Sequence, residues 1–291
     1  MPTIAALTLY PIKSCAGMSL RAALLTDAGL SHEGIGDRQW MVVDMQGQFL
    51  TQREYPDMAL IRPTISGKDL ALHAPGMPPL FLPMSPGQAD SRHAPVEVQI
   101  WDDRLPAYDC GESAAAWFGT MLGIECRLVR FSPSVTRLIS PTWIENRVVS
   151  TLFSDAYPLL LTSVASLEDL NLKLRASGRT EVPMNRFRPN VVVDGITAFE
   201  EEYAQFFIIG RSDEGELDIC LKPVKPCARC PMPAVDQVTG KVGPNPVDIL
   251  QSYRANALLE GAATFGMNTI LTKGAGQYLR VGDKVTLELA F

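Results

Sequence analysis

Short strand-forming segments separated by glycine, proline and aspartate fill the first 105 residues of this chain. This pattern is typical of a β-rich fold, because branched and aromatic residues favour strands while Gly, Pro and Asp favour turns. The segments predicted as strands are Thr3–Tyr10, Ala22–Thr26, Gln39–Asp44, Ala59–Pro63, Asp69–His73 and Val96–Ile100. We therefore expect a β-rich barrel here and not an array of alternating strands and helices.

Helices are few and come later in the chain. Residues 113–122 are predicted to form a helix that Gly123 closes, and a second helix is capped by Ser163 or Ser166 and reaches about Ala176. A short helix is predicted over Asp248–Ala257. The remaining predicted strands are Cys126–Phe131, Val191–Val193, Ala204–Ile209, Leu217–Pro223 and an alternating segment after the tight turn at Gly282-Asp283.

These patterns predict a fold that is mainly β with some α (α+β). A polar stretch that ends near Arg147 is predicted to be a loop, and a soft domain boundary falls near residues 130–150. We expect a β-barrel-like N-terminal domain over residues 1–130 and a second β-rich barrel domain over residues 131–291. A chain of 291 residues is long enough for two such domains and a large buried core.

Composition narrows the classes of function. The formal net charge of −6 argues against nucleic acid or a membrane surface as the main partner. The longest apolar runs are shorter than a membrane-spanning helix requires, and the N-terminal residues lack the pattern of a signal peptide. Six unpatterned cysteines fit a reducing compartment. A cytoplasmic protein is expected.

The segment that carries the clearest chemistry contains two cysteines, Cys227 and Cys230. The basic residues Lys222, Lys225 and Arg229 are near them in sequence, and nearby cations stabilise the thiolate, the form of cysteine that binds metals and attacks electrophiles. Prolines 226, 231 and 233 disfavour a regular helix, so the pair is predicted to lie on a stiff loop.

Several interpretations of this pair remain open. A structural zinc site needs four ligands, but the other four cysteines and the three histidines are scattered along the chain. A thioredoxin-like redox pair normally begins a helix, which Pro-Met-Pro after Cys230 disfavours. The pair can also be two unreactive cysteines. The remaining interpretation is a single thiolate ligand to a cofactor that brings its other ligands with it.

Three polar clusters interrupt the hydrophobic pattern and are candidates for an anion site. Lys13 and Ser14 follow the first predicted strand, where an ammonium, a hydroxyl and backbone N–H groups suit a phosphate. Arg38 precedes another strand, and a structural ion pair is its alternative role. Arg186, Arg188 and Asn190 could bind an anionic ligand that contains a ring. A solvated lysine is the alternative for Lys13.

Other features are expected to be unremarkable. Asp102-Asp103 is predicted to be a turn, and Glu200-Glu201-Glu202 is predicted to be a solvated face. No GxxxxGK[ST] loop and no GxGxxG after a strand occurs, so the nucleotide-binding folds are poorly supported.

In the light of these clusters, the chain resembles the MOSC family, named for the C-terminal domain of molybdenum cofactor sulfurase. It is most similar to the subgroup of the mitochondrial amidoxime-reducing component and its bacterial relatives. The match extends over essentially the whole chain. The segments that carry it are Tyr10–Gly17, Gly36–Asp44, Ser154–Pro158 with Ser163–Leu167, Arg186–Asn190, and Lys225–Cys230 with Val235-Asp236.

The resemblance implies a MOSC N-terminal β-barrel domain, a MOSC domain and a molybdenum cofactor between them. It implies that Cys230 is the protein's thiolate ligand to molybdenum and that Asp155 is an acid near the metal. Residues implied to bind the pterin or its phosphate are Lys13, Ser14, Arg38, Ser163, Arg186, Arg188, Asn190 and Arg229. Ala156-Tyr157 depart from the family pattern, in which Thr-Ser often follows the acid, so the resemblance does not carry the hydroxyl contacts of that Thr-Ser pair over to these two positions.

The resemblance also implies a function, reduction of hydroxylamines, N-hydroxylated purines or amidoximes. Electrons are expected from a separate ferredoxin-type or cytochrome-type protein, because the chain lacks the C-x₄-C-x₂-C spacing of a plant-type iron–sulfur domain. One alternative is a sulfur carrier or cofactor-handling protein that uses a cysteine persulfide. Another is a non-catalytic zinc module.

Overall fold

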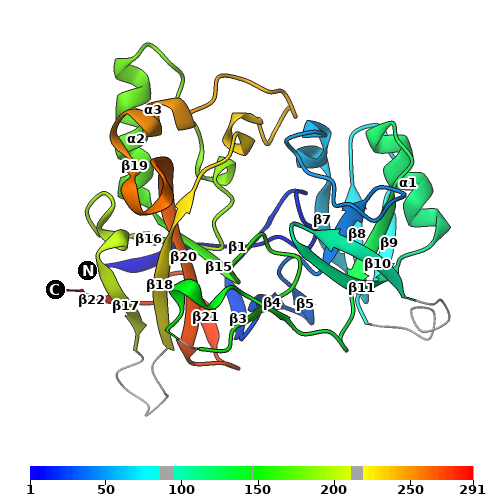
Figure 1. Ribbon diagram of the computed structural model, residues 1–291, viewed down its shortest axis with the longest axis horizontal. Coiled ribbons are helices and arrows are strands. Elements are labelled where there is room, and N and C mark those ends of the chain that lie inside the picture. Colours follow the sequence, from blue (N-terminus) through cyan, green and yellow to red (C-terminus); the bar gives the residue numbers. More distant parts are fainter. Residues whose placement is uncertain (86–94, 146, 211–218, 291) are drawn as a thin grey trace.

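The computed structural model describes residues 1–85, 95–145, 147–210 and 219–290 (Figure 1). Strands dominate these residues, and the α-helices among them are α1 (Glu112–Leu122), α2 (Val164–Ala176) and α3 (Val247–Tyr253). The 3₁₀ helices are η1 (Pro56–Leu60), η2 (Pro141–Trp143), η3 (Met184–Arg186), η4 (Glu200–Glu202), η5 (Met232–Ala234) and η6 (Ala257–Leu259). The predicted class, mainly β with some α, is confirmed.

The largest sheet has the strand order β2-β1-β16-β15-β20-β18-β17-β22, with β19 paired to β20. Its strands are β1 (Thr3–Leu9), β2 (Met18–Leu20), β15 (Leu159–Ser163), β16 (Val191–Asp194), β17 (Ala204–Ile209), β18 (Ile219–Ala228), β19 (Ala255–Asn256), β20 (Ala262–Lys273) and β22 (Thr286–Leu289). The N-terminal strand β1 pairs antiparallel with β16, nearly 190 residues later. The start of the chain is therefore part of the sheet that the second half builds, as Figure 1 shows.

The remaining strands form smaller sheets, with the orders β10-β11-β12-β6, β21-β3-β4-β5, β7-β8-β9 and β13-β14. Their bounds are β3 (Ala22–Thr26), β4 (Gly29–His32), β5 (Ile35–Gly36), β6 (Trp40–Val43), β7 (Arg62–Ser66), β8 (Asp69–His73), β9 (Leu80–Pro83), β10 (Val96–Ile100), β11 (Asp103–Asp109), β12 (Arg127–Phe131), β13 (Arg137–Leu138), β14 (Ser150–Thr151) and β21 (Tyr278–Arg280). In Figure 1, α1 lies beside β7–β11, whereas α2 and α3 lie at one end of the large sheet.

One hydrophobic cluster joins the two halves of the molecule. It contains Leu9 of β1, Trp40 of β6, Phe118 of α1 and Phe207 of β17, all of them buried. Burial of such side chains is the main favourable term in folding, so this cluster ties the two halves together. A separate cluster that includes Leu170 and Phe265 lies within the second half. The predicted boundary near residue 130 stays a prediction, since β1 and β3 pair across it with β16 and β21.

Several predicted elements have different bounds in the structure. The segment 59–63 is not one strand, because η1 occupies Pro56–Leu60 and β7 begins at Arg62. The helix predicted over 248–257 ends at Tyr253, where β19 begins two residues later and pairs with β20. Residues 217 and 218 of a predicted strand lie outside the described residues. In the stretch predicted to be a loop before Arg147, the structure forms β13 and η2.

The cysteine segment is not a loop throughout. Strand β18 continues through Cys227 to Ala228, and only Cys230 lies beyond it. Prolines are tolerated in this strand because its register with β20 shifts between Pro223 and Lys225 and again between Pro226 and Ala228. Such bulges release the local requirement for a ladder hydrogen bond. The bulged end of a strand therefore carries the thiols.

The three glutamates at 200–202 are not a solvated face. Glu201 is fully buried, and both of its carboxyl oxygens accept hydrogen bonds from Ser166 Oγ, at 2.7 and 2.9 Å. Ser166 is held in turn by Ser163, the N-cap of α2, whose Oγ lies 2.7 Å from Ser166 Oγ. Glu202 forms an ion pair with Arg254. This acidic run is therefore part of the packing beneath α2.

We expect Glu201→Gln to stabilise the protein at neutral pH. Burial raises the pKa of Glu201, although the Ser166 hydroxyl opposes that rise. The unfolded carboxyl ionises first as pH increases, so wild-type stability is fully present below the unfolded pKa and falls as pH approaches the folded pKa. The loss is about 1.4 kcal/mol for each unit by which the folded pKa exceeds the unfolded one, and a glutamine avoids it.

Urea unfolding of the wild type and Glu201→Gln between pH 4 and pH 8 measures this effect. The stability difference in favour of the variant should shrink towards the acidic end of the range. Glu54→Gln, at an exposed position, is the matched control and should give a difference near zero throughout. An equal stability for Glu201→Gln and wild type at every pH would show that Glu201 carries no burial cost.

No helix in the described ranges is both long and apolar enough to cross a membrane.

Candidate functional site

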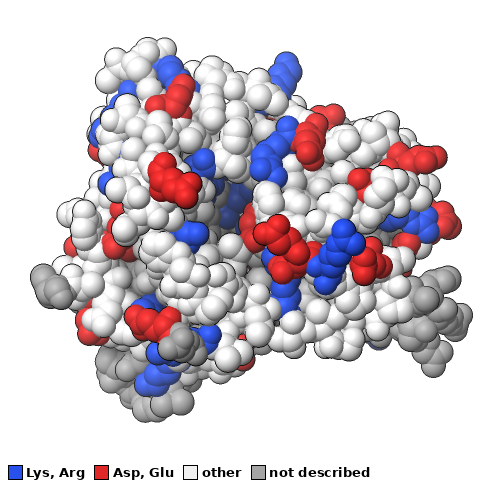
Figure 2. Space-filling view, in the orientation of Figure 1, with Lys and Arg blue, Asp and Glu red and all other residues white. Residues whose placement is uncertain are grey.

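A cavity of about 360 Å³ lies where loops of the N-terminal half meet β15, β18 and the segment before β16. Figure 2 shows the hollow in this face of the molecule, with lysine and arginine side chains inside it. Eight of the ten residues predicted for the site line the cavity. They are Lys13, Ser14, Arg38, Asp155, Arg188, Asn190, Arg229 and Cys230.

Lys13 and Asp155 form an ion pair on the cavity wall. Lys13 is buried, and its Nζ donates to Asp155 Oδ1 at 2.5 Å and to the Phe153 carbonyl at 3.2 Å. Burial lowers the pKa of Lys13, and the Asp155 carboxylate opposes that shift. Asp155 itself is 66% exposed. The Lys13 side chain is therefore not the solvated lysine that was its alternative role.

The pKa of Asp155 is lowered to about 2. Its partial removal from water acts in the opposite direction, but the attraction and hydrogen bond of Lys13 outweigh this effect, and Trp101 Nε1 also donates to Oδ1 at 3.1 Å. Asp155 therefore presents a carboxylate to the cavity at every physiological pH.

A second group of charges surrounds the Tyr10 ring. The guanidinium carbons of Arg38 and Arg188 lie 4.4 and 4.3 Å from the centre of that ring. Arg38 forms an ion pair with Asp37, and Asp37 Oδ1 also accepts a hydrogen bond from the Tyr10 N–H at 2.8 Å. The structural role considered for Arg38 is thus realised, while its side chain also reaches the cavity wall. Arg188 Nη1 donates to the Cys15 carbonyl at 2.6 Å.

Asn190 positions its neighbours. Its Oδ1 accepts from Arg38 Nη1 at 3.1 Å and from the Leu160 N–H at 3.1 Å, and its Nδ2 donates to the Thr8 carbonyl at 3.2 Å. The side chain is buried and its amide is engaged by protein groups. Its contribution to the site is to hold Arg38 and the β1–β15 backbone in place.

The thiol segment also lines the cavity. Arg229 Nη1 donates to Cys227 Sγ at 3.2 Å, and Nη2 donates to the Phe187 carbonyl at 2.8 Å. Cys230 is half-buried, and both thiols line the cavity. The guanidinium of Arg229 therefore links Cys227 to the arginine-containing segment 186–190.

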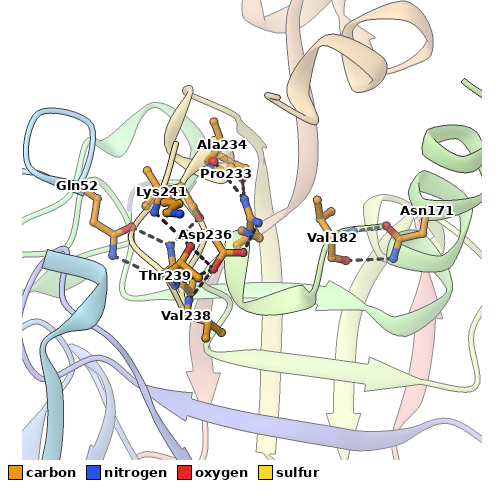
Figure 3. Close-up of polar contacts among 12 residues, drawn as sticks. Gln52, Asn171, Val182, Pro233, Ala234, Asp236, Val238, Thr239 and Lys241 are labelled. Carbon is orange, nitrogen blue, oxygen red and sulfur yellow. Dashed lines mark hydrogen bonds and ion pairs between the residues drawn. The ribbon is translucent and has the colours of Figure 1, made fainter. Parts of the chain in front are cut away.

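Two predicted site residues do not line the cavity. Ser163 caps α2, where its Oγ accepts from the Ser166 N–H at 3.1 Å. Arg186 donates to the carbonyls of Pro233 and Ala234 at 3.0 and 3.1 Å and to Asp236 Oδ2 at 2.7 Å. Figure 3 labels the partners Pro233, Ala234 and Asp236 in the loop after Cys230. The family resemblance implied that both residues bind the ligand, whereas in the structure Ser163 caps α2 and Arg186 holds the loop after Cys230.

The loop after Cys230 is also tied to the N-terminal half. Gln52 Nε2 donates to the Ser14 carbonyl at 2.6 Å, and Gln237 Nε2 donates to Gln52 Oε1 at 3.0 Å and to the Val235 carbonyl at 3.1 Å. Figure 3 shows Gln52 facing this loop. The two amides fix the lysine–serine turn relative to the thiol segment, so the two walls of the cavity form one unit.

Backbone strain is concentrated at the cavity. Eight described non-glycine residues have a positive φ, and four of them, Ser14, Arg38, Trp101 and Arg188, line the cavity, with φ of 66°, 51°, 53° and 56°. Left-handed conformations of this kind are unfavourable for residues with a Cβ and persist only where the surroundings enforce them. Such strain commonly marks sites where side chains must point in set directions.

The cavity wall suits a large anion that also needs a sulfur ligand. Six lysines and arginines line it, against the single acid Asp155. Arg188 Nη2, Arg229 Nε and Ser154 Oγ are buried without a hydrogen-bond partner in the described part of the chain. Within those residues no group of three His, Cys, Asp or Glu could hold a metal ion. A metal bound at Cys230 would therefore bring most of its other ligands.

Sequence reasoning missed Trp101 and Arg53, which also line the cavity. Trp101 lies in the two-residue turn between β10 and β11, where the Arg53 guanidinium is 5.2 Å from its ring centre. The available signal was a bulky residue at a turn position, which normally takes glycine or asparagine.

Two family models match the chain, the MOSC N-terminal beta barrel domain over residues 1–125 and the MOSC domain over residues 149–286. Mitochondrial amidoxime reducing component 2 of Rattus norvegicus is 34% identical over 97% of this chain and 82% of the relative. Mitochondrial amidoxime-reducing component 1 of Homo sapiens is 32% identical over 98% of this chain and 82% of the relative. Molybdenum cofactor sulfurase of Homo sapiens is 29% identical over 96% of this chain, which matches 31% of the relative.

Proposed function

Because the chain belongs to the MOSC family, in the group of the mitochondrial amidoxime-reducing components, we propose that it is a molybdenum-cofactor-dependent oxidoreductase. Its substrates are N-hydroxylated compounds, namely hydroxylamines, N-hydroxypurines or amidoximes. Its electrons come from a separate ferredoxin-type or cytochrome-type protein. The cytoplasmic location expected from composition stays a prediction, since these relatives are named mitochondrial.

One observation carries the proposal, a thiol and a group of cations that line the same cavity. The thiol is that of Cys230, and the cations include Lys13, Arg38 and Arg188. A thiolate is a suitable ligand for a soft metal centre, and guanidinium groups suit the phosphate of a pterin cofactor. The unpartnered guanidinium nitrogens of Arg188 and Arg229 support the same assignment.

In this proposal each residue has a separate task. Cys230 is the ligand to the metal, and Ser14, Arg38, Arg188 and Arg229 bind the pterin and its phosphate. Asn190 holds Arg38 in its orientation. Arg186 and Asp236 hold the loop that follows Cys230, so they act through the position of the thiolate and not by contact with the cofactor.

The cofactor, when bound, supplies the two-electron chemistry that removes oxygen from the N–OH group. The balanced reaction is R–NH–OH + 2 e⁻ + 2 H⁺ → R–NH₂ + H₂O. Lys13 holds a proton at Nζ beside the Asp155 carboxylate, which faces the cavity. The lowered pKa of Lys13 makes its ammonium a better acid than that of an ordinary lysine, and Asp155 orients the N–OH group.

A sulfur-carrier role is the second candidate, favoured by the contact between Arg229 and Cys227. That guanidinium places a positive charge 3.2 Å from a second thiol in the cavity, which suits a persulfide anion on either cysteine. The similarity to molybdenum cofactor sulfurase is compatible with this role. Sulfur released by cyanide from the purified protein, with only substoichiometric molybdenum, would favour it over the reductase.

The test of the main proposal is metal and pterin analysis of protein purified from a host that makes the cofactor. We expect near-stoichiometric molybdenum and pterin, together with reduction of hydroxylamine by a reduced viologen. Molybdenum and pterin without turnover of hydroxylamine, N-hydroxypurines or amidoximes would reject the reductase and keep the cofactor site. Zinc in place of molybdenum would reject both the reductase activity and the molybdenum cofactor site.

A further inference from the structure

A second cavity of about 440 Å³ adjoins the first. The two share the wall formed by Trp101, Asp155, Ala156, Tyr157 and Lys225. On its other side the second cavity is closed by β13 and η2, the segment that the sequence predicted to be a loop. A ligand in the second cavity would therefore reach the carboxylate of Asp155 at the shared wall.

The walls of the second cavity are rich in aromatic side chains. Trp101 is 43% exposed and is fixed by Phe49, whose ring centre is 4.9 Å away at a steep angle, and by the hydrogen bond from its Nε1 to Asp155. Trp143 lines the second cavity but not the first, and Lys225 Nζ lies 5.7 Å from the centre of the Trp143 ring. Tyr157 completes the wall between them. Flat rings are the groups that such walls bind best.

The charges distinguish the second cavity from the first. Arg137 is already engaged, because its Nε donates to Asp103 at 2.7 Å and its Nη1 donates to the carbonyls of Leu152 and Ser154 at 2.9 and 2.6 Å. Asp102 is exposed and has no ion pair with a described residue. The acids Asp102, Asp103 and Asp155 line the second cavity against the cations Arg137 and Lys225, so it suits a neutral or cationic ligand. The first cavity, with six cations and one acid, suits an anion.

We infer that the second cavity binds the aromatic body of the substrate and thereby makes the enzyme selective for N-hydroxylated compounds that carry an aromatic ring over hydroxylamine itself. The inference rests on the proposed function. The ring lies between Trp101 and Trp143, and the N–OH group points across the shared wall towards Asp155. Trp143 is then a specificity-determining residue, because it lines this cavity and not the one assigned to the cofactor.

The kinetic test compares benzamidoxime with hydroxylamine in Trp143→Ala and Trp143→Phe. In Trp143→Ala the ratio of kcat/KM for benzamidoxime to kcat/KM for hydroxylamine should fall about tenfold, through KM, because an aromatic contact is lost. Trp143→Phe should restore most of that ratio. Molybdenum content should stay equal in all samples, and Tyr278→Ala, an exposed aromatic deletion elsewhere, is the matched control. An unchanged ratio in Trp143→Ala would overturn the inference.

A binding measurement separates failure of this inference from failure of the proposed function. Calorimetric titration of the purified protein, without an electron donor, uses benzamidine and benzoate, which share a ring and differ in charge. Benzamidine should bind more tightly than benzoate, and Trp143→Ala should weaken benzamidine about tenfold. This result can hold even if no N–OH compound is reduced. If benzoate binds more tightly than benzamidine, or if benzamidine affinity is unchanged in Trp143→Ala, the subsite is rejected.

Discussion

Cys230→Ser is expected to lose molybdenum and to reduce hydroxylamine no faster than the reaction without enzyme. Serine replaces a thiolate by a hydroxyl, which stays protonated at neutral pH and is a poor ligand for a soft metal centre. The substitution is small, and Cys230 is half-buried beyond the end of β18. Stability should therefore change by less than about 1 kcal/mol.

Cys227→Ser is the matched control for this experiment. Cys227 lines the same cavity three residues earlier, but its Sγ is occupied by Arg229. Its serine variant should keep most of the molybdenum and measurable turnover, with circular dichroism and thermal unfolding unchanged in both variants. Retention of molybdenum and activity in Cys230→Ser, with loss of both in Cys227→Ser, would show that the metal ligand is Cys227 and would contradict the proposal.

Asp37→Ala is expected to lower the free energy of unfolding by about 3–5 kcal/mol. Asp37 is buried beside Arg38, and its carboxylate also accepts the Tyr10 N–H. Removing it leaves Arg38 and Arg188 around the Tyr10 ring without the nearest opposing charge. An uncompensated buried charge costs far more than an exposed ion pair contributes.

Urea unfolding measures this loss, with Glu97→Ala as the matched control. The Glu97–Arg104 pair is 3.5 Å apart, with side chains 71% and 67% exposed, so its removal should cost less than about 1 kcal/mol. Added phosphate should recover part of the stability of Asp37→Ala and little of Glu97→Ala, because an anion in the cavity would replace the missing charge. Equal losses in the two variants would show that Asp37 does not balance the site.

The sequence located the cavity because its charged residues interrupt short hydrophobic segments. Lys13, Arg38 and Arg188 follow or precede buried strands, where a charge has no structural requirement, and the structure brings them to one wall. Helix α2 was predictable for a local reason, since the N-cap of Ser163 depends on residues three apart.

The errors come from interactions that local patterns do not contain. The prediction that Glu201 is solvated was wrong because its burial depends on a hydrogen bond from Ser166, 35 residues away, which the local sequence does not show. The position of Arg186 outside the cavity lining was not visible in the sequence, because its partners, including Asp236, lie about 50 residues later. The strand through Cys227 was missed because prolines normally end strands, and only the bulged pairing with β20 accommodates them.

The position of β1 has a consequence for how the protein is made. This strand is an interior member of the large sheet, between β2 and β16, so it cannot complete its pairing until residues 191–194 have left the ribosome. The thiol at Cys230 is synthesised later still. Pairings between distant segments form slowly, and domains assemble as units during synthesis. The cavity is therefore completed near the end of translation, and a ligand that contacts both its N-terminal residues and Cys230 can bind only a nearly complete chain.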